Sequence, residues 1–449
     1  MTYPEKIQKY LKKNGIEVGD FVRVSKGKSR YDGILMPRIE FGDVNSIVIK
    51  LDNGYNIGIR FSKDVKIELI KKGSPIEFKS AKLEIEKIPE KPEVSILGTG
   101  GTLASRVEYR TGAVFPAFSP ADFLLSFPDL KEIANINGRK IFELFSEDIT
   151  PYHWKIIARE VVKEIKKKVD GIVLMHGTDT MHYTSAAISF MVQNLPIPVV
   201  FVGSQRSSDR GSSDNAMNLL SAVITAAKSD IAEVSVCMHG TSSDDFCYVH
   251  QGTKVRKMHT SRRDTFRSIN VLPFAKVWYL ERRIEYLRND FKKRGSREVK
   301  LDDRINPNVA LIYSHPGIKP EFIENLAKFY DGVVIAGTGL GHVSTNPTNN
   351  KLCKSLVPSL KRLIDSGIPV VIAPQTIYGR INLNVYTAGR LLKKIGVIGH
   401  NCDWTPEAAL CKLMWVLGKT KNMEKIRKMM LENIAGEISN RSIVEAFLI

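Results

Sequence analysis

Hydroxyl and carboxylate side chains follow two apolar segments of this sequence, and their placement suits nucleophilic chemistry. Segment 94–97 leads into residues 98–104 (GTGGTLA), and segment 171–175 leads into residues 176–180 (HGTDT). Short apolar runs that end in glycine are typical of buried strands followed by tight turns. Thr102 then lies at the carboxyl end of a strand, where glycine-rich backbone offers N–H groups to a substrate oxygen. The pattern predicts a hydroxyl nucleophile beside an oxyanion site.

The glycine-rich segment does not match the common phosphate-binding loops. A dinucleotide fingerprint needs a small residue at position 103, where this sequence has leucine, and no Gly-Lys-Ser/Thr motif follows within the segment. An ordinary turn is therefore the remaining alternative to a catalytic loop.

A threonine hydroxyl needs a neighbour that removes its proton, and a lysine is the candidate base. Lys254 and Lys257 are the two candidates, because burial or a carboxylate such as Asp179 can tune a lysine for this role. A solvated surface charge is the alternative for Lys257. Capping of the helix expected from Thr180 onward is the alternative for Asp179. His176 is expected to be a packing or turn residue.

Strands that alternate with helices must bring these residues together. Two further apolar segments, 198–202 and 234–238, also end in glycine beside polar side chains, which include Gln205. The carboxyl ends of parallel strands lie along one edge of a sheet, so loops far apart in sequence converge there. We therefore predict a doubly wound parallel α/β sheet over residues 93–300. Renewed alternation predicts a smaller α/β domain over residues 301–449.

The N-terminal part of the chain has a different pattern. Residues 3–14 are expected to form a short amphipathic helix, and five short alternating segments follow between residues 21 and 69. Turn residues separate these segments, which predicts a small antiparallel β-barrel over residues 1–75. The Lys-, Glu- and Pro-rich stretch 76–92 is typical of a linker.

Composition excludes several classes of protein. The chain has 449 residues, of which 43% are hydrophobic, and can therefore hold roughly three domains. Its five cysteines never occur as C-x-x-C, so neither a disulfide framework nor a metal site is predicted. No signal peptide or membrane-spanning segment is recognised, and we expect a cytoplasmic protein without a membrane partner.

The formal net charge of +18 is the most unusual bulk property. Such a charge favours nucleic acid or other acidic partners. A Lys- and Glu-rich surface of the kind found in heat-adapted proteins is an equally weighted alternative. Part of the charge lies in the basic stretch 282–300.

Residues 97–104 (LGTGGTLA) and 176–181 (HGTDTM) together resemble both signature motifs of the type I/II asparaginase family. The likeness runs from about residue 94 to the C-terminus. It implies an asparaginase-like fold for both α/β domains. It also implies that Thr102 is the nucleophile. A triad of Thr178, Asp179 and Lys257 would then activate Thr102 or a water molecule. The remaining catalytic residues implied by the resemblance are Thr178, Asp179, Lys257 and the flexible-loop residue Tyr109.

The same resemblance implies a substrate-binding set. Ser146 matches the position that holds the α-carboxylate and amine of the substrate, and Glu147 stands where the family usually has glutamine. Residues in the strand-end loops complete the predicted set: Gly101, Gly177 and Gln205.

Three features distinguish the chain from ordinary asparaginases: the N-terminal β domain, the basic insertion and a longer C-terminus. With them it resembles the asparaginase-like D subunits of archaeal glutamyl-tRNA(Gln) amidotransferases. The resemblance implies hydrolysis of glutamine to glutamate and ammonia, with no cofactor in this chain. A partner, the E-subunit, would use ATP and Mg²⁺ to amidate Glu-tRNA(Gln) and would make most contacts with tRNA(Gln). A homodimer through the asparaginase-like domains is implied, and hence two copies of each of the two proteins.

Two alternatives stay open at this point. The first is a free-standing L-asparaginase in which the N-terminal barrel serves only oligomerisation. The second is a non-catalytic scaffold that binds tRNA, and the filled catalytic positions argue against it.

The nucleophile assignment gives a first prediction. The variant Thr102→Val keeps the shape of the side chain but lacks the attacking oxygen, so ammonia release should be abolished while the fold is retained. Ammonia assays and circular dichroism of the variant test both statements. Glutaminase activity retained in this variant would contradict the assignment.

Overall fold

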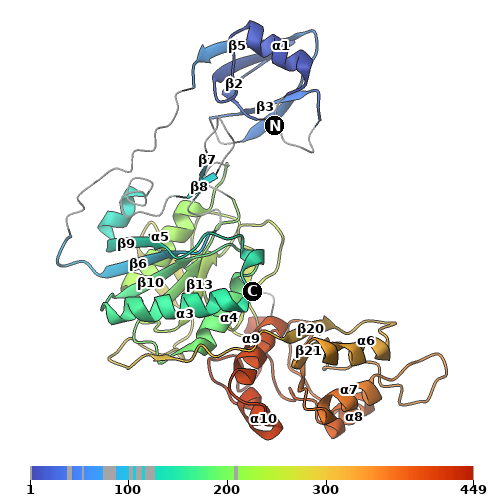
Figure 1. Cartoon of the computed structure of the whole chain (residues 1–449). Coiled ribbons are helices and arrows are strands. Elements are labelled where there is room, and N and C mark those ends of the chain that lie inside the picture. The colour runs from blue at the N-terminus through green and yellow to red at the C-terminus, as the bar shows by residue number, and fades with distance from the viewer. Residues whose placement is uncertain are drawn as a thin grey trace.

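The structure is a computed structural model that describes residues 3–37, 43–52, 55–73, 87–100, 105–107, 114–116, 127–206 and 211–447. Its elements fall into an N-terminal antiparallel sheet, a central mixed sheet and a C-terminal parallel sheet, which Figure 1 shows from blue to red. This arrangement confirms the predicted fold class, an α/β protein preceded by a small antiparallel β domain.

The N-terminal group is a five-stranded antiparallel sheet with one helix. Its elements are α1 (Glu5–Lys13), β1 (Phe21–Lys26), β2 (Ser29–Leu35), β3 (Ser46–Lys50), β4 (Asn56–Arg60) and β5 (Val65–Lys71). The strands pair in the order β4-β3-β2-β1-β5. Apolar residues from all five strands pack with α1 into one cluster, because alternate side chains of each strand face inward. The sheet therefore wraps around a core of its own.

The central sheet has eight strands in the order β18-β17-β14-β13-β12-β10-β6-β9. They are β6 (Glu93–Gly98), β9 (Asn135–Lys140), β10 (Gly171–Met175), β12 (Val199–Val202), β13 (Val234–His239), β14 (Cys247–Gln251), β17 (Ala275–Trp278) and β18 (Arg283–Tyr286). The strands from β9 to β13 are parallel, and the other three are antiparallel. Counted along the chain, the parallel strands have the order 2-1-3-4-5, which reverses between β6 and β10. Ligands of doubly wound sheets bind outside the carboxyl ends of strands at such a reversal.

Side chains of the parallel strands alternate between two apolar clusters on opposite faces of the sheet. On β10, Ile172 and Leu174 belong to one cluster, whereas Val173 and Met175 belong to the other. The first cluster includes α3 (Pro151–Lys166) and α4 (Met181–Met191), and the second includes α5 (Asn215–Lys228). Parallel sheets covered on both faces have such continuously apolar strands. Helices on both faces thus fix the strands whose ends carry the predicted site.

The C-terminal group is a three-stranded parallel sheet with surrounding helices. Its elements are β20 (Val309–Tyr313), β21 (Gly332–Gly337), β22 (Val370–Pro374), α6 (Pro320–Asn325), α7 (Val357–Asp365), α8 (Thr387–Ile395), α9 (Pro406–Leu417) and α10 (Met423–Leu431). The strands are in chain order, and their apolar side chains pack against α7 and α8. Within the ranges given above, no helix is both long and apolar enough to cross a bilayer.

Short elements complete the chain. The strands are β7 (Ser105–Val107), β8 (Val114–Pro116), β11 (Val192–Gln193), β15 (Val255–Lys257), β16 (Phe266–Ser268) and β19 (Lys300–Leu301), and the 3₁₀ helices are η2 (Pro128–Glu132), η3 (Ser146–Asp148), η4 (Leu326–Lys328) and η5 (Val444–Ala446). Strands β15 and β16 pair with each other in an antiparallel hairpin outside the eight-stranded sheet.

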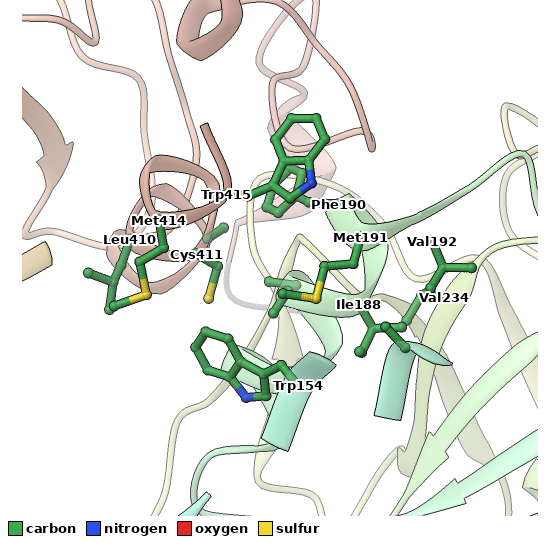
Figure 2. Packing of buried hydrophobic residues seen from close by; sticks show 14 of the residues in the cluster. Trp154, Ile188, Phe190, Met191, Val192, Val234, Leu410, Cys411, Met414 and Trp415 are labelled. Atoms are coloured by element: carbon green, nitrogen blue, oxygen red, sulfur yellow. The ribbon is translucent and has the colours of Figure 1, made fainter. Parts of the chain in front are cut away.

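Helix α9 joins the two α/β groups through a shared apolar cluster. Figure 2 shows Leu410, Cys411 and Met414 of α9 on one side of this cluster and Met191 of α4 on the other. The rings of Phe190 and Trp415 lie 6.1 Å apart between centroids. Helix α9 therefore belongs to the core of the central sheet as much as to the C-terminal group.

Arg288, Arg294 and Arg297 of the basic stretch 282–300 donate to backbone carbonyls and a side-chain amide. Arg294 bonds the carbonyl oxygen of Ala226 near the end of α5 at 2.5 Å, and Arg297 bonds that of Leu195 at 2.7 Å. Arg288 bonds Oε1 of Gln251 at 2.6 Å. Cations near helix C-termini are stabilising, so this part of the positive charge supports the fold.

The shared cluster predicts a large effect of truncating one of its rings. Phe190 is fully buried, so Phe190→Ala removes its contacts and leaves a cavity, at a cost of about 3–5 kcal/mol in unfolding free energy. Guanidinium unfolding followed by tryptophan fluorescence measures the change. The matched control is Leu352→Ala, since Leu352 is 94% exposed and its truncation should change stability by less than about 0.5 kcal/mol. Equal midpoints for the two variants would refute the role of the cluster.

Candidate active site at the carboxyl ends of β6 and β10

The loop between β10 and α4 presents Thr178 and Asp179. Thr178 is buried, whereas the Asp179 side chain is 64% exposed. Helix α4 begins at Met181 with Thr180 as its N-cap, so the capping alternative for Asp179 is wrong. The Thr180 hydroxyl instead donates to the carbonyl oxygen of Ser146 at 2.6 Å. The Asp179 carboxylate is thus available to another partner, near a helix N-terminus that favours negative charge.

That partner is Lys257 at the end of β15. Its Nζ donates to Thr178 Oγ1 at 2.9 Å and to Asp179 Oδ1 at 2.7 Å, across 79 and 78 residues of sequence. The Lys257 side chain is only 11% exposed. The hairpin of β15 and β16 therefore brings together the three residues that the sequence predicted.

Hydroxyl, amine and carboxylate form one hydrogen-bonded chain in this arrangement. This is the order of nucleophile, base and orienting group in acyl-transfer triads. The Asp179 carboxylate orients the amine, and the amine contacts the Thr178 oxygen. The geometry suits activation of a hydroxyl or of a water molecule placed beside it.

The chain leaves β6 beside the end of the neighbouring strand β10, where Gly98 pairs with Met175. The Thr99 hydroxyl donates to the carbonyl oxygen of Met175 at 2.9 Å. Gly100 has φ +115°, and a Cβ there would lie 2.1 Å from the carbonyl oxygen of Leu144, so only glycine fits. Three predicted site residues lie outside the described residues and stay predictions: Gly101, Thr102 and Tyr109.

Ser146 and Gly177 lie against each other beside this loop. A Cβ on Gly177 would lie 2.9 Å from Cβ and 3.0 Å from Oγ of Ser146, which is itself buried. Glu147 is exposed, and its Oε2 lies 3.4 Å from Ser146 Oγ. Glycine at position 177 therefore permits the close approach of a predicted substrate-binding serine to the triad loop.

Gln205 follows β12 in a loop held by a buried carboxylate. Its backbone N–H donates to Asp214 Oδ2 at 3.0 Å, and Asp214 also accepts bonds from Ser204 Oγ and Asn218 Nδ2, each at 2.9 Å. A Cβ on Gly203 would lie 2.9 Å from Thr178 Cγ2, so this loop borders the triad. Among the described residues, Gln205 Nε2 is buried and has no hydrogen-bond partner. Asp214 was not predicted, because its only signal in the sequence is its position before an apolar helix.

Lys254 and His176 do not join the triad. Lys254 is fully buried and pairs with Asp403 Oδ1 at 2.9 Å, so Lys257 is the lysine of the site. Burial lowers the pKa of His176 to about 4, and the neutral ring bonds the carbonyl oxygen of Gly177 at 2.6 Å. His176 is a packing residue, as expected. In the part of the chain that the structure describes, no group of three His, Cys, Asp or Glu side chains could hold a metal ion.

A second carboxylate stabilises the hairpin that carries Lys257. Asp264 accepts bonds from Arg262 Nε at 2.8 Å and from Arg267 Nη2 at 2.9 Å. The hydrogen bond from Arg262, together with the charge of both arginines, lowers the pKa of Asp264 to about 2. This network was not predicted, because its partners are ordinary surface residue types in the sequence.

Comparisons with known proteins identify the family to which the chain is similar. Three family profiles match: "Asparaginase, N-terminal" at residues 93–291, "Glutaminase/Asparaginase C-terminal domain" at residues 308–430 and "GatD N-terminal domain" at residues 16–70. The chain is 50% identical to the D-subunit of glutamyl-tRNA(Gln) amidotransferase from Pyrococcus furiosus, covering 99% of this chain and 100% of the relative. It is 49% identical to the corresponding protein of Methanothermobacter thermautotrophicus, covering 100% of both.

Solved asparaginases share the fold of the central and C-terminal groups. The thermostable L-asparaginase from Thermococcus kodakarensis is 35% identical with a TM-score of 0.68, covering 78% of this chain and 100% of that chain. L-asparaginase I from Vibrio cholerae is 30% identical with a TM-score of 0.65, covering 78% and 99%.

The low pKa of Asp264 predicts a specific acid sensitivity. Its pKa of about 2 lies below the ordinary value of 3.8, so the charged carboxylate stabilises the folded chain above that value. The contribution is lost as the pH falls from about 4 to about 2. Thermal unfolding across this window should show a smaller loss of stability for Asp264→Asn than for the unchanged chain. Identical pH profiles would disprove the stabilising role of this carboxylate.

Proposed function

Since the chain belongs to the family of glutamyl-tRNA(Gln) amidotransferase D-subunits, we propose that it hydrolyses glutamine to glutamate and ammonia for the amidation of Glu-tRNA(Gln). The contact of Lys257 with Thr178 and Asp179 is the observation that carries this proposal. It supports an acyl-transfer triad beside the loop that leads to the nucleophile candidate Thr102.

In the proposed mechanism, the Thr102 oxygen attacks the side-chain carbonyl carbon of glutamine. The hydroxyl proton passes through the triad to the leaving nitrogen, the C–N bond breaks and ammonia departs. Backbone N–H groups of the strand-end loops stabilise the oxyanion, a kind of contribution that is worth roughly a hundredfold or more in rate. Water next to Thr178 then attacks the acyl-enzyme, which releases glutamate and restores the Thr102 hydroxyl. Tyr109 completes the proposed catalytic set.

Substrate binding is assigned to the residues around the β10 loop. Ser146 lies buried against Gly177, in a position to hold the α-substituents of glutamine. Glu147 is exposed beside it, and its carboxylate is a natural partner for the α-ammonium group. Gly101 and Gln205 border the same space in this proposal.

We also propose a division of labour between two proteins. The E-subunit binds ATP and Mg²⁺, activates the glutamyl group and accepts the ammonia, while this chain needs no cofactor. Two copies of each protein would assemble, with this chain forming the central homodimer and tRNA(Gln) contacting mainly the partner. Because the acceptor is a charged tRNA, the reaction belongs in the cytoplasm.

A free-standing L-asparaginase is the second candidate function. The observation in its favour is the 35% identity to the Thermococcus kodakarensis L-asparaginase along that enzyme's whole length. It leaves the N-terminal sheet without a role in catalysis.

Ammonia release separates the two candidates. Glutamine and asparagine are supplied in turn to the chain alone, and then to the chain with the E-subunit, ATP, Mg²⁺ and glutamylated tRNA(Gln). We expect glutamine turnover to rise strongly with the complete acceptor system, because ammonia without an acceptor is wasted. Asparagine turnover that is rapid and independent of the partner would instead establish the asparaginase.

A further inference from the structure

The strand pairing of the hairpin that carries Lys257 is short. β15 and β16 contribute three residues each and, among the strands that the structure describes, pair only with each other. Two-stranded ribbons are at best marginally stable in water. Arg256 lies directly opposite Arg267 in the pairing, and like charges in such a position are destabilising. Asp264 in the loop of the hairpin binds Arg267 at 2.9 Å, whereas the carboxylate that binds Arg256 comes from outside the hairpin.

Helix α9 supplies this carboxylate from the C-terminal part of the chain. Glu407, in the first turn of α9, accepts a bond from Arg256 Nε at 2.7 Å across 151 residues of sequence. Its side chain is only 3% exposed, so the pair is shielded from solvent. Glu407 thus supplies the negative charge beside Arg256, as Asp264 does beside Arg267, and the two carboxylates together offset the repulsion between the arginines.

The direction of Lys257 follows from the position of Arg256. Successive side chains of a strand point to opposite faces, and a one-residue slip would exchange them. With Arg256 fixed against α9, Lys257 must point away from α9 and toward Thr178 and Asp179.

Glu407 also faces the helix that follows the other half of the triad. His182, in the first turn of α4, has its Nε2 3.9 Å from Glu407 Oε1. Glu407 thus lies between the hairpin of Lys257 and the helix that begins just after Asp179.

Asp403, four residues before Glu407, holds both ends of the hairpin. Its carboxylate pairs with Lys254, and its carbonyl oxygen accepts a bond from Asn270 Nδ2 at 2.9 Å. Lys254 precedes β15 and Asn270 follows β16. Both strands are therefore anchored to the same short segment of the C-terminal part of the chain.

We propose that Glu407 is a positioning residue for Lys257, which lets the docking of α9 set the activity of the triad. This inference rests on the proposed function, since it requires that Lys257 takes part in glutamine hydrolysis. Glu407 acts through Arg256 and the register of the hairpin, and it does not touch the substrate.

The variant Glu407→Gln tests the proposal because it keeps the shape of the side chain and removes its charge. We expect kcat for glutamine hydrolysis to fall roughly 10- to 100-fold, because small misplacements of catalytic groups cause losses of this size. KM should stay nearly unchanged. Arg256→Met should give a similar loss. The double variant should lose no more activity than either single one, because both act through one contact.

Asp302→Asn is the matched control. Asp302 is also buried and pairs with Lys419 at 2.7 Å, just beyond the other end of α9. Its loss should lower stability without changing kcat. Full activity of Glu407→Gln, or an equal fall of kcat in Asp302→Asn at matched loss of stability, would overturn the proposal.

Lys257→Met in the same assay separates this inference from the proposed function. If Lys257→Met retains full turnover, the proposed role of the triad fails. If Lys257→Met is inactive and Glu407→Gln is fully active, only the positioning role of Glu407 fails.

Discussion

The hydrogen bonds from Lys257 to Thr178 and Asp179 impose the constraint on which the other features of the site depend. The hydroxyl and the carboxylate lie on one loop, and the amine that contacts both oxygens comes from a different element. The parallel sheet fixes the loop, because β10 lies beside the point where the strand order reverses. The hairpin of β15 and β16 fixes the amine. Carboxylates on α9 and in the segment before it bind the residues of this hairpin.

This constraint explains why so much buried charge gathers behind the site. Lys254 with Asp403 and Arg256 with Glu407 are ion pairs in which each carboxylate is almost completely shielded from water. A buried pair is a weak source of stability, because desolvation of both ions offsets their attraction. Its geometric requirement is strict, however, since either ion left alone in the interior is costly. Pairs of this kind suit a site in which the amine of Lys257 must be positioned accurately.

The sequence predicted the parallel sheet and the antiparallel N-terminal strands, because apolar runs ending in glycine mark strand ends and alternating short segments mark antiparallel strands. Lys257 was grouped with Thr178 and Asp179 only through the resemblance to asparaginases. Pattern alone did not distinguish Lys257 from Lys254, which differ in burial and not in type. Asp403, Glu407 and Asp214 were missed, since each acts through partners that only the folded chain brings near. The catalytic and substrate-binding roles of all the site residues stay predictions, and Thr102, Tyr109 and Gly101 also lie outside the described part of the structure.

The apolar cluster that α9 shares with α4 has a consequence for how the molecule is made. The loop with Thr178 and the strand with Lys257 leave the ribosome well before α9 does. Until that helix has been synthesised, the apolar side of α4 that it covers lies open, and Arg256 lacks its partner Glu407. The two α/β groups are made one after the other, but one apolar cluster contains residues of both. A nascent chain therefore carries every residue of the triad for some time before it can carry a finished active site.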